Sequence, residues 1–156
     1  MKTILILVGK TTDKHFQAGI NDYVERISHY MPFELVTIPE LKNTKNLSEE
    51  QQKTSEGELI LKQLQSSDTV VLLDEHGKEF RSIELARWLE QKRNIARRLV
   101  FIIGGPYGFS PAVYARANEQ LSLSKLTFSH QMIRLVFTEQ IYRACTIIKG
   151  EPYHHE

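Results

Sequence analysis

The segment Leu99-Val-Phe-Ile-Ile-Gly-Gly-Pro-Tyr-Gly-Phe-Ser-Pro111 decides the fold. Its apolar run is typical of a buried strand, and the glycines that follow indicate where the strand stops. Ser110 is suited to cap a helix, and Pro111 is suited to the first helical position. A strand followed in this way exposes backbone donors at the carboxyl edge of a sheet, where open α/β sheets bind ligands. We therefore expect a ligand site at this edge.

The glycines of this segment do not match the common nucleotide-binding patterns. The sequence contains no G-x-x-x-x-G-K-[ST], and Gly104, Gly105 and Gly108 do not fit G-x-G-x-x-G. The expected site therefore belongs to another class of cofactor binder. A phosphate-dependent enzyme that uses the helix N-terminus at Ser110 as an anion site stays open as an alternative.

Apolar runs alternate with segments of helical periodicity along the rest of the chain. This alternation predicts one three-layer α/β domain over residues 1–156, with a mainly parallel sheet between two layers of helices. The expected strands are Thr3–Val8, Phe33–Ile38, Asp68–Leu73 and Leu99–Ile103. The expected helices are Thr12–Tyr30, a helix opened by a capping box at Ser48 and ending near Gln65, one capped by Ser82, Pro111–Gln120, and one from about His130 to Ile148.

Two segments do not follow this alternation of strands and helices. Asp74–Lys78 is predicted to be a turn with Gly77 as its flexible point. Leu121–Phe128 is apolar but interrupted by hydroxyl side chains and a lysine, so we expect backbone wrapped around a ligand there instead of a regular strand.

The composition and net charge are those of an ordinary globular protein. The 156 residues are 41% hydrophobic and 25% charged with a formal net charge of +1, which indicates an ordinary globular chain without a strong overall field. The one cysteine, Cys145, fits a reducing cytosol, and no apolar run approaches a membrane span, so a cytoplasmic location without membrane attachment is expected. A basic stretch from Arg81 to Arg98 is either a local RNA-binding face or a solvated helix.

The sequence closely resembles the bacterial ribosomal RNA large subunit methyltransferase H family of the SPOUT superfamily. The resemblance covers the whole chain and is carried by five segments: Ile102-Ile-Gly-Gly-Pro-Tyr-Gly108, Leu121-Ser-Leu-Ser-Lys-Leu-Thr-Phe128, His130-Gln-Met-Ile-Arg134, Glu139-Gln-Ile-Tyr-Arg-Ala144 and Pro152-Tyr-His154.

The resemblance implies a C-terminal trefoil knot, a homodimer and S-adenosylmethionine as methyl donor. It also implies methylation of N3 of a pseudouridine in helix 69 of 23S rRNA within assembled ribosomes. No metal is implied. By position, the cofactor-binding residues would be Leu73, Gly105, Ser124, Lys125, Leu126, Thr127, Phe128 and Ser129.

Three residues are candidates for the catalytic step: His154, Tyr153 and Arg134. An imidazole titrates near neutral pH, an aromatic ring can stack on a base, and an arginine can bind phosphate. The alternatives are a terminal tail without a role, a metal site at the adjacent histidines, and an arginine that pairs with Glu139 across the helix or the dimer.

Two positions differ from many relatives of the family: Ser129 stands where they have proline, and His155 where they have arginine. The alternative function is a non-catalytic, ribosome-associated binding module on the same fold. The last expected helix is apolar on more than one face, which suits a dimer interface or a large core. If the chain dimerises, we expect a composite site in which the tail of one subunit approaches the cofactor of the other.

Overall fold

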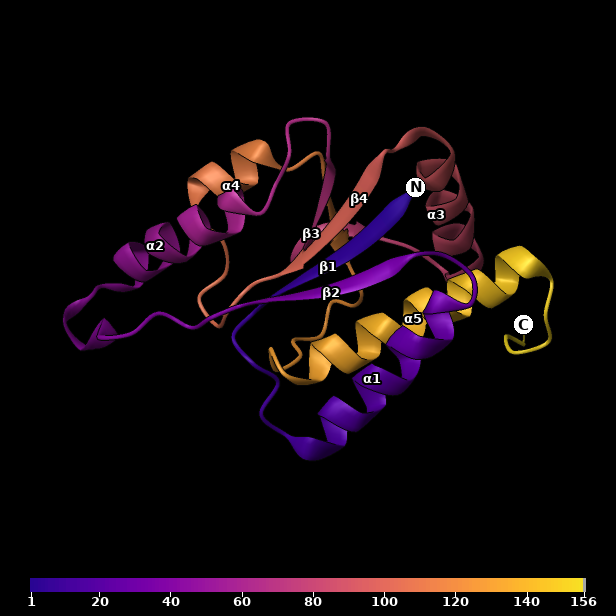
Figure 1. Cartoon of the computed structure of the whole chain (residues 1–156), viewed down its shortest axis with the longest axis horizontal. Helices are drawn as coiled ribbons and strands as arrows, with labels where there is room; N and C mark the ends of the chain where they lie inside the picture. Colours follow the sequence, from indigo (N-terminus) through magenta and orange to yellow (C-terminus); the bar gives the residue numbers. More distant parts are fainter. Residues whose placement is uncertain (156) are drawn as a thin grey trace.

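The computed structural model describes residues 1–155, which form an α/β fold with a five-stranded sheet (Figure 1). The elements along the chain are β1 (Lys2–Val8), α1 (Lys14–Ser28), β2 (Phe33–Ile38), a short 3-10 turn (Thr44–Asn46), α2 (Glu49–Lys62), β3 (Thr69–Glu79), α3 (Ser82–Ile95), β4 (Arg98–Ile103), α4 (Pro111–Arg116), β5 (Glu119–Ser122) and α5 (Met132–Lys149).

The sheet has the order β2-β1-β4-β3-β5, and every neighbouring pair is parallel. All five strands therefore end at the same edge. The mainly parallel sheet predicted from the alternation of strands and helices is confirmed.

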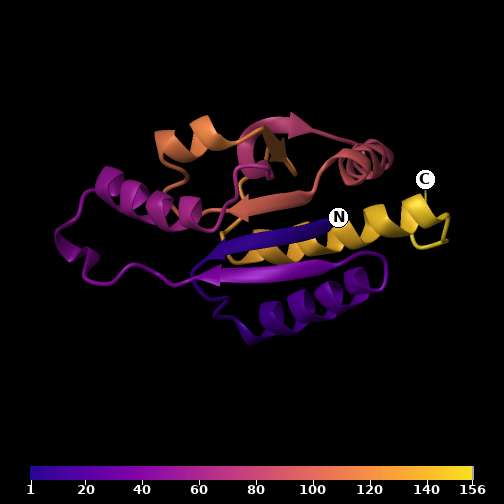
Figure 2. The same ribbon diagram turned by 45° about the horizontal axis from the view of Figure 1, so that its top comes forward.

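Helices cover both faces of the sheet, as the predicted three layers require (Figure 2). Leu5 and Leu7 of β1 face a core shared with α1, α3 and α5, whereas Ile4 and Ile6 face a second core shared with α2 and α4. Successive side chains of a strand point to opposite faces of the sheet. Because both faces are covered by helices, β1 and β4 are apolar on both sides.

Local signals in the sequence placed two helix starts correctly. The side chain of Ser48 accepts a hydrogen bond from Gln51 N at 3.1 Å, and Gln51 Oε1 accepts one from Ser48 N at 2.8 Å. Ser110 Oγ accepts a hydrogen bond from Val113 N, with Pro111 at the first helical position. Both caps satisfy N–H groups that a helix cannot pair internally.

Other boundaries differ from the prediction. Ser82 is the first residue of α3, and the N-cap is Arg81. The side chain of Glu84 in the first turn accepts a hydrogen bond from Arg81 N at 2.7 Å. The helix at Pro111 ends at Arg116 and not at Gln120. The chain leaves the helix there because Asn118 N donates to Val70 O at 2.9 Å and Asn118 Oδ1 accepts from Val70 N at 2.7 Å, which starts β5 beside β3.

The predicted turn at Asp74–Lys78 is wrong, because these residues belong to the long strand β3. The pairing with β5 shifts between Leu73 and Lys78, so the strand bulges and then resumes. Gly77 is required for close approach: a Cβ atom there would lie 2.7 Å from backbone atoms of Gln120 and Leu121.

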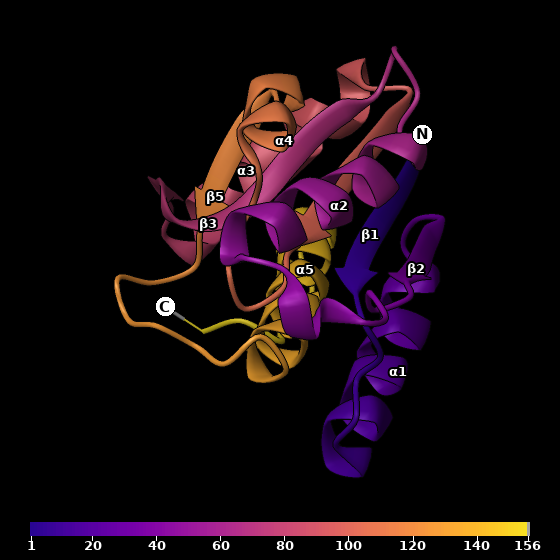
Figure 3. The same ribbon diagram turned by 90° about the vertical axis from the view of Figure 1, so that its left-hand side faces the viewer.

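Two connections form the surface beyond the ends of β3, β4 and β5. Residues 104–110, which we name the glycine turn, join β4 to α4. Residues 123–131, which we name the serine loop, join β5 to α5 and extend past the strand ends (Figure 3). Across residues 1–155, no helix combines the length and apolar character needed to cross a membrane.

Candidate functional site

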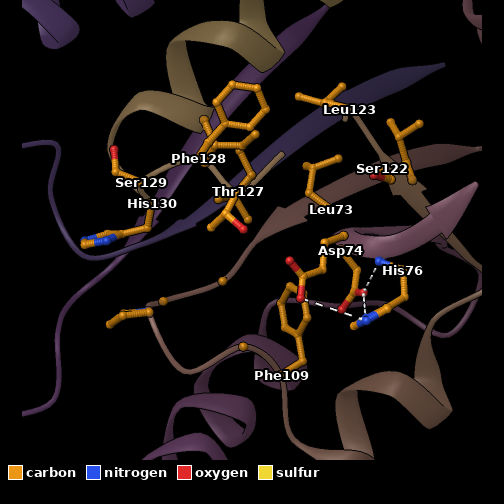
Figure 4. A pocket seen from close by; sticks show the side chains of 18 of the residues that line it. Leu73, Asp74, His76, Phe109, Ser122, Leu123, Thr127, Phe128, Ser129 and His130 are labelled. Carbon is orange, nitrogen blue, oxygen red and sulfur yellow. Dashed lines mark hydrogen bonds and ion pairs between the residues drawn. The ribbon is translucent and has the colours of Figure 1, made fainter. Parts of the chain in front are cut away.

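A cavity of about 570 Å³ lies at the carboxyl ends of β3, β4 and β5. Its walls are residues 73–76 in the middle of β3, the glycine turn, the end of β5, the serine loop up to His130, and Ile133 in the first turn of α5. In Figure 4, Thr127, Phe128 and Ser129 of the serine loop lie across from Asp74 and Phe109. The ligand site expected at this edge of the sheet thus coincides with a cavity.

The glycine turn approaches its own aromatic residue closely. A Cβ atom at Gly104 would lie 2.9 Å from Cε1 of Phe109, so a larger residue would displace that buried ring. Gly108 has φ 82°, in the left-handed region that favours glycine. These two glycines let the chain reverse after β4 and carry Ser110 to the start of α4.

Hydroxyl side chains organise the serine loop. Ser122 Oγ donates to Ser124 O at 2.9 Å, and Ser124 Oγ accepts from Leu126 N at 3.0 Å. Ser129 Oγ accepts from Met132 N at 3.0 Å, next to the start of α5. These bonds pair two backbone groups of the loop and the first N–H of α5, so the loop has a defined shape without regular structure. The segment Leu121–Phe128, where wrapped backbone is expected instead of a regular strand, is the end of β5 followed by this loop.

Seven of the eight residues carried over as cofactor-binding line the cavity, and Lys125 does not. Lys125 is exposed, and Leu126 beside it is 74% exposed although it also lines the cavity. The seven are Leu73, Gly105, Ser124, Leu126, Thr127, Phe128 and Ser129.

Sequence reasoning missed the acidic side of the cavity. Asp74 and Glu75 line it because β3 continues beyond Leu73, and Asp74 Oδ1 accepts a hydrogen bond from His76 N at 2.9 Å. The Tyr114 hydroxyl donates to Asp74 from α4. Burial, together with this contact, raises the pKa of Tyr114 to about 12. The position of Asp74 directly after an apolar run is the sequence feature that could have indicated these acidic residues.

Arg134 does not line the cavity. Its side chain is 0% exposed, and its guanidinium donates to Val8 O at 2.7 Å, Gly9 O at 2.9 Å and Thr11 Oγ1 at 3.0 Å. Burial lowers the pKa of this guanidinium. The hypothesis that Arg134 binds RNA phosphate is therefore at odds with this structure, in which Arg134 joins the start of α5 to the end of β1.

Tyr153 and His154 are also absent from the cavity wall. The tail, residues 151–155, folds back along α5, where the Tyr153 hydroxyl donates to Glu139 Oε1 at 3.2 Å and His154 Nδ1 lies 3.1 Å from an Arg143 nitrogen. Arg143 in turn donates to Glu139 Oε1 at 2.6 Å. Burial is the main cause that raises the pKa of Tyr153. One chain therefore does not place its tail in its own cavity.

Two cations of the basic stretch have partners within the fold. Arg98 forms a bidentate pair with buried Asp68 at 2.8 and 3.0 Å, and Lys92 pairs with Glu119. These pairs reduce the charge that the stretch offers to RNA. Among residues 1–155, no group of three His, Cys, Asp or Glu side chains is arranged to hold a metal ion.

Proteins of a known family resemble this chain over nearly its whole length. A family described as "Predicted SPOUT methyltransferase" matches residues 1–154. The chain is 65% identical to a ribosomal RNA large subunit methyltransferase H from Bacteroides fragilis over 157 aligned positions, which cover 100% of both chains. It is 64% identical to the protein of that name from Phocaeicola vulgatus and 54% identical to that from Porphyromonas gingivalis, with 100% of both chains covered in each case. The chain belongs to the ribosomal RNA large subunit methyltransferase H family of SPOUT methyltransferases.

Proposed function

We propose that this protein transfers the methyl group of S-adenosylmethionine to N3 of a pseudouridine in helix 69 of 23S rRNA, within assembled ribosomes. One observation carries the proposal: the residues expected to bind the methyl donor gather, Lys125 excepted, around one cavity at the carboxyl edge of the sheet. The names of the relatives, which specify ribosomal RNA of the large subunit, support the substrate class.

The cavity fits an adenosine-containing ligand in its chemistry. Leu73, Leu126 and Phe128 offer apolar surface for a purine ring, while the glycine turn and the serine loop offer backbone N–H and C=O groups for its edge. We infer that these two connections belong to a C-terminal trefoil knot, which would hold both against the end of β3.

Methyl transfer from a sulfonium depends more on the position of the donor relative to the nucleophile than on activation of the donor. The bound sulfonium supplies an electrophilic methyl group whose leaving thioether is neutral, so no metal is needed. The walls of the cavity would hold the donor in line with the nucleophile and exclude water, which lowers the entropic part of the barrier. The imide N3–H must lose a proton, and a base or a group that stabilises the resulting anion would act there.

We infer that the functional unit is a homodimer in which the tail completes the partner's cavity. Tyr153 and His154 do not line the cavity of their own chain, and the apolar side chain of Leu126, which does line it, is exposed. In this arrangement Tyr153 would stack on the base and His154 would act on the proton. Arg134 would keep the start of α5 in place.

Mixed dimers test the composite site. One subunit lacks residues 151–156, and the other keeps its tail but carries a bulky Gly105→Trp substitution in the cavity. A composite site predicts activity in the mixed dimer, because an intact cavity meets an intact tail. Complete inactivity of correctly folded mixed dimers would contradict it.

Calorimetric titration tests the cofactor assignment, with ATP and NAD as controls. We expect micromolar binding of S-adenosylmethionine and none of either control. Preferential binding of ATP would instead favour a phosphate-dependent enzyme. A His154→Ala variant should keep this binding and lose rate, whereas a binding module would have no methyl transfer to lose.

A further inference from the structure

Helix α2 contacts the glycine turn from the face of the sheet opposite to α5. α2 lies beside α4 in the layer that covers this face (Figure 1). The carboxylate of Glu56, in the middle of α2, accepts a hydrogen bond from Gly105 N at 3.3 Å. This is a long-range contact to one of the residues that the resemblance implies as cofactor-binding.

The neighbouring residue fixes the other end of the turn. Gly57 is buried, and a Cβ atom there would lie 2.5 Å from Ser110 Oγ and 3.2 Å from Val113 Cγ2. α2 can therefore reach the N-terminus of α4 only because this position is glycine. Glu56 and Gly57 of α2 therefore contact residues near the beginning and at the end of the glycine turn, Gly105 and Ser110.

Glu56 occupies an unfavourable electrostatic position. Burial raises its pKa, and the charge of Glu40, from the segment after β2, adds to that rise, whereas the hydrogen bond from Gly105 opposes it. In the part of the chain that the structure describes, Glu56 forms no ion pair with a lysine or arginine. The hydrogen bond from Gly105 N is therefore the polar contact that compensates the partial burial of this carboxylate.

The hydrogen bond also orients a neighbouring carbonyl. A peptide unit is planar and trans, so an N–H of Gly105 directed at α2 sets the carbonyl of Gly104 on the opposite side. Gly104 and Gly105 both line the cavity. The direction of this one peptide therefore decides whether the turn presents an acceptor or a donor to a ligand.

We propose that Glu56 is a positioning residue, whose carboxylate holds the Gly104–Gly105 peptide in the orientation that the methyl donor requires. The part that concerns the donor rests on the proposed function, whereas the part that concerns the turn does not. Glu58 is the matched control, because it is an exposed carboxylate two residues further along the same helix.

The test for the turn is an NMR titration of the ligand-free, uniformly ¹⁵N-labelled protein. The amide proton of Gly105 should shift with pH, with a midpoint above the ordinary glutamate value, because an ionised carboxylate is the stronger acceptor. Glu56→Gln should abolish this titration, and Glu58→Gln should leave it unchanged. A Gly105 amide that does not titrate, in a folded protein, would overturn the proposal.

The test for the donor is the dissociation constant of S-adenosylmethionine. Glu56→Ala should weaken binding about tenfold through loss of one charge-assisted hydrogen bond, and Glu56→Gln should weaken it less because its amide oxygen can still accept. Glu58→Ala should bind like the wild type. Wild-type binding by folded Glu56→Ala would overturn the role toward the donor. If the wild type itself does not bind while Gly105 titrates, the proposed function fails and the positioning of the turn stands.

Discussion

Replacing Arg134 by methionine tests its role as an internal clamp. Methionine keeps the apolar stem of the side chain but removes every donor of the guanidinium. The carbonyls of Val8 and Gly9, which receive hydrogen bonds of 2.7 and 2.9 Å, would then be left without this partner in a buried setting. The bonds to His130 O and Thr11 Oγ1 would be lost as well.

The loss of stability can be estimated from these contacts. A buried polar group left unsatisfied costs about 1–3 kcal/mol, and two carbonyls in buried contacts, those of Val8 and Gly9, lose their partner here. Removal of the buried charge relieves desolvation and offsets part of this cost. We therefore expect Arg134→Met to lower the free energy of unfolding by about 3–4 kcal/mol.

Urea unfolding at one fixed protein concentration measures this loss, since association would otherwise contribute to the apparent stability. Arg26→Met is the control, because Arg26 is exposed and its pair with Asp22 at 3.3 Å is a surface ion pair, which stabilises a fold only slightly. A loss for Arg134→Met no larger than that for Arg26→Met would refute the clamp. It would return Arg134 to the candidates for RNA contact.

Three further outcomes follow from the structure. Gly77→Ala should destabilise the protein by about 2 kcal/mol or more, since the new Cβ atom would meet the β5 backbone at 2.7 Å, and an unchanged urea midpoint would contradict this. The raised pKa of Tyr114 means that its hydroxyl stabilises the fold below pH 10 and that this contribution is lost as the pH rises through about 12, so the stability advantage over Tyr114→Phe should vanish across that window. A pH-independent difference would argue against the Tyr114–Asp74 contact. Burial raises the pKa of Cys145 to about 11, so at pH 8 a thiol reagent should label it only as fast as the protein opens, and rapid labelling of the folded protein would be inconsistent with this packing.

Local sequence signals predicted the parts of the fold that depend on neighbours along the chain. The capping box at Ser48 and the cap at Ser110 with Pro111 were identified because each is complete within four residues. The parallel sheet followed from the alternation of apolar strands and helices. The resemblance to a known family supplied the residues around the cavity.

Long-range contacts decided what the sequence could not predict. The end of β3 was mistaken for a turn because its residues resume pairing only when β5, some forty residues later, lies beside it. Arg134 is a candidate for RNA or cofactor contact in the sequence because nothing local indicates that carbonyls at the end of β1 surround its guanidinium. Glu56 gave no signal at all, since its partner Gly105 is 49 residues away.

Methyl transfer to ribosomes tests the central claim most directly. Ribosomes that lack the modification would be incubated with the protein and S-adenosylmethionine carrying a labelled methyl group, and the labelled nucleotide would be mapped in the rRNA. We expect one methyl group per ribosome, in 23S rRNA, at N3 of a pseudouridine in helix 69. Label absent from 23S rRNA, or present at another nucleotide, would contradict it.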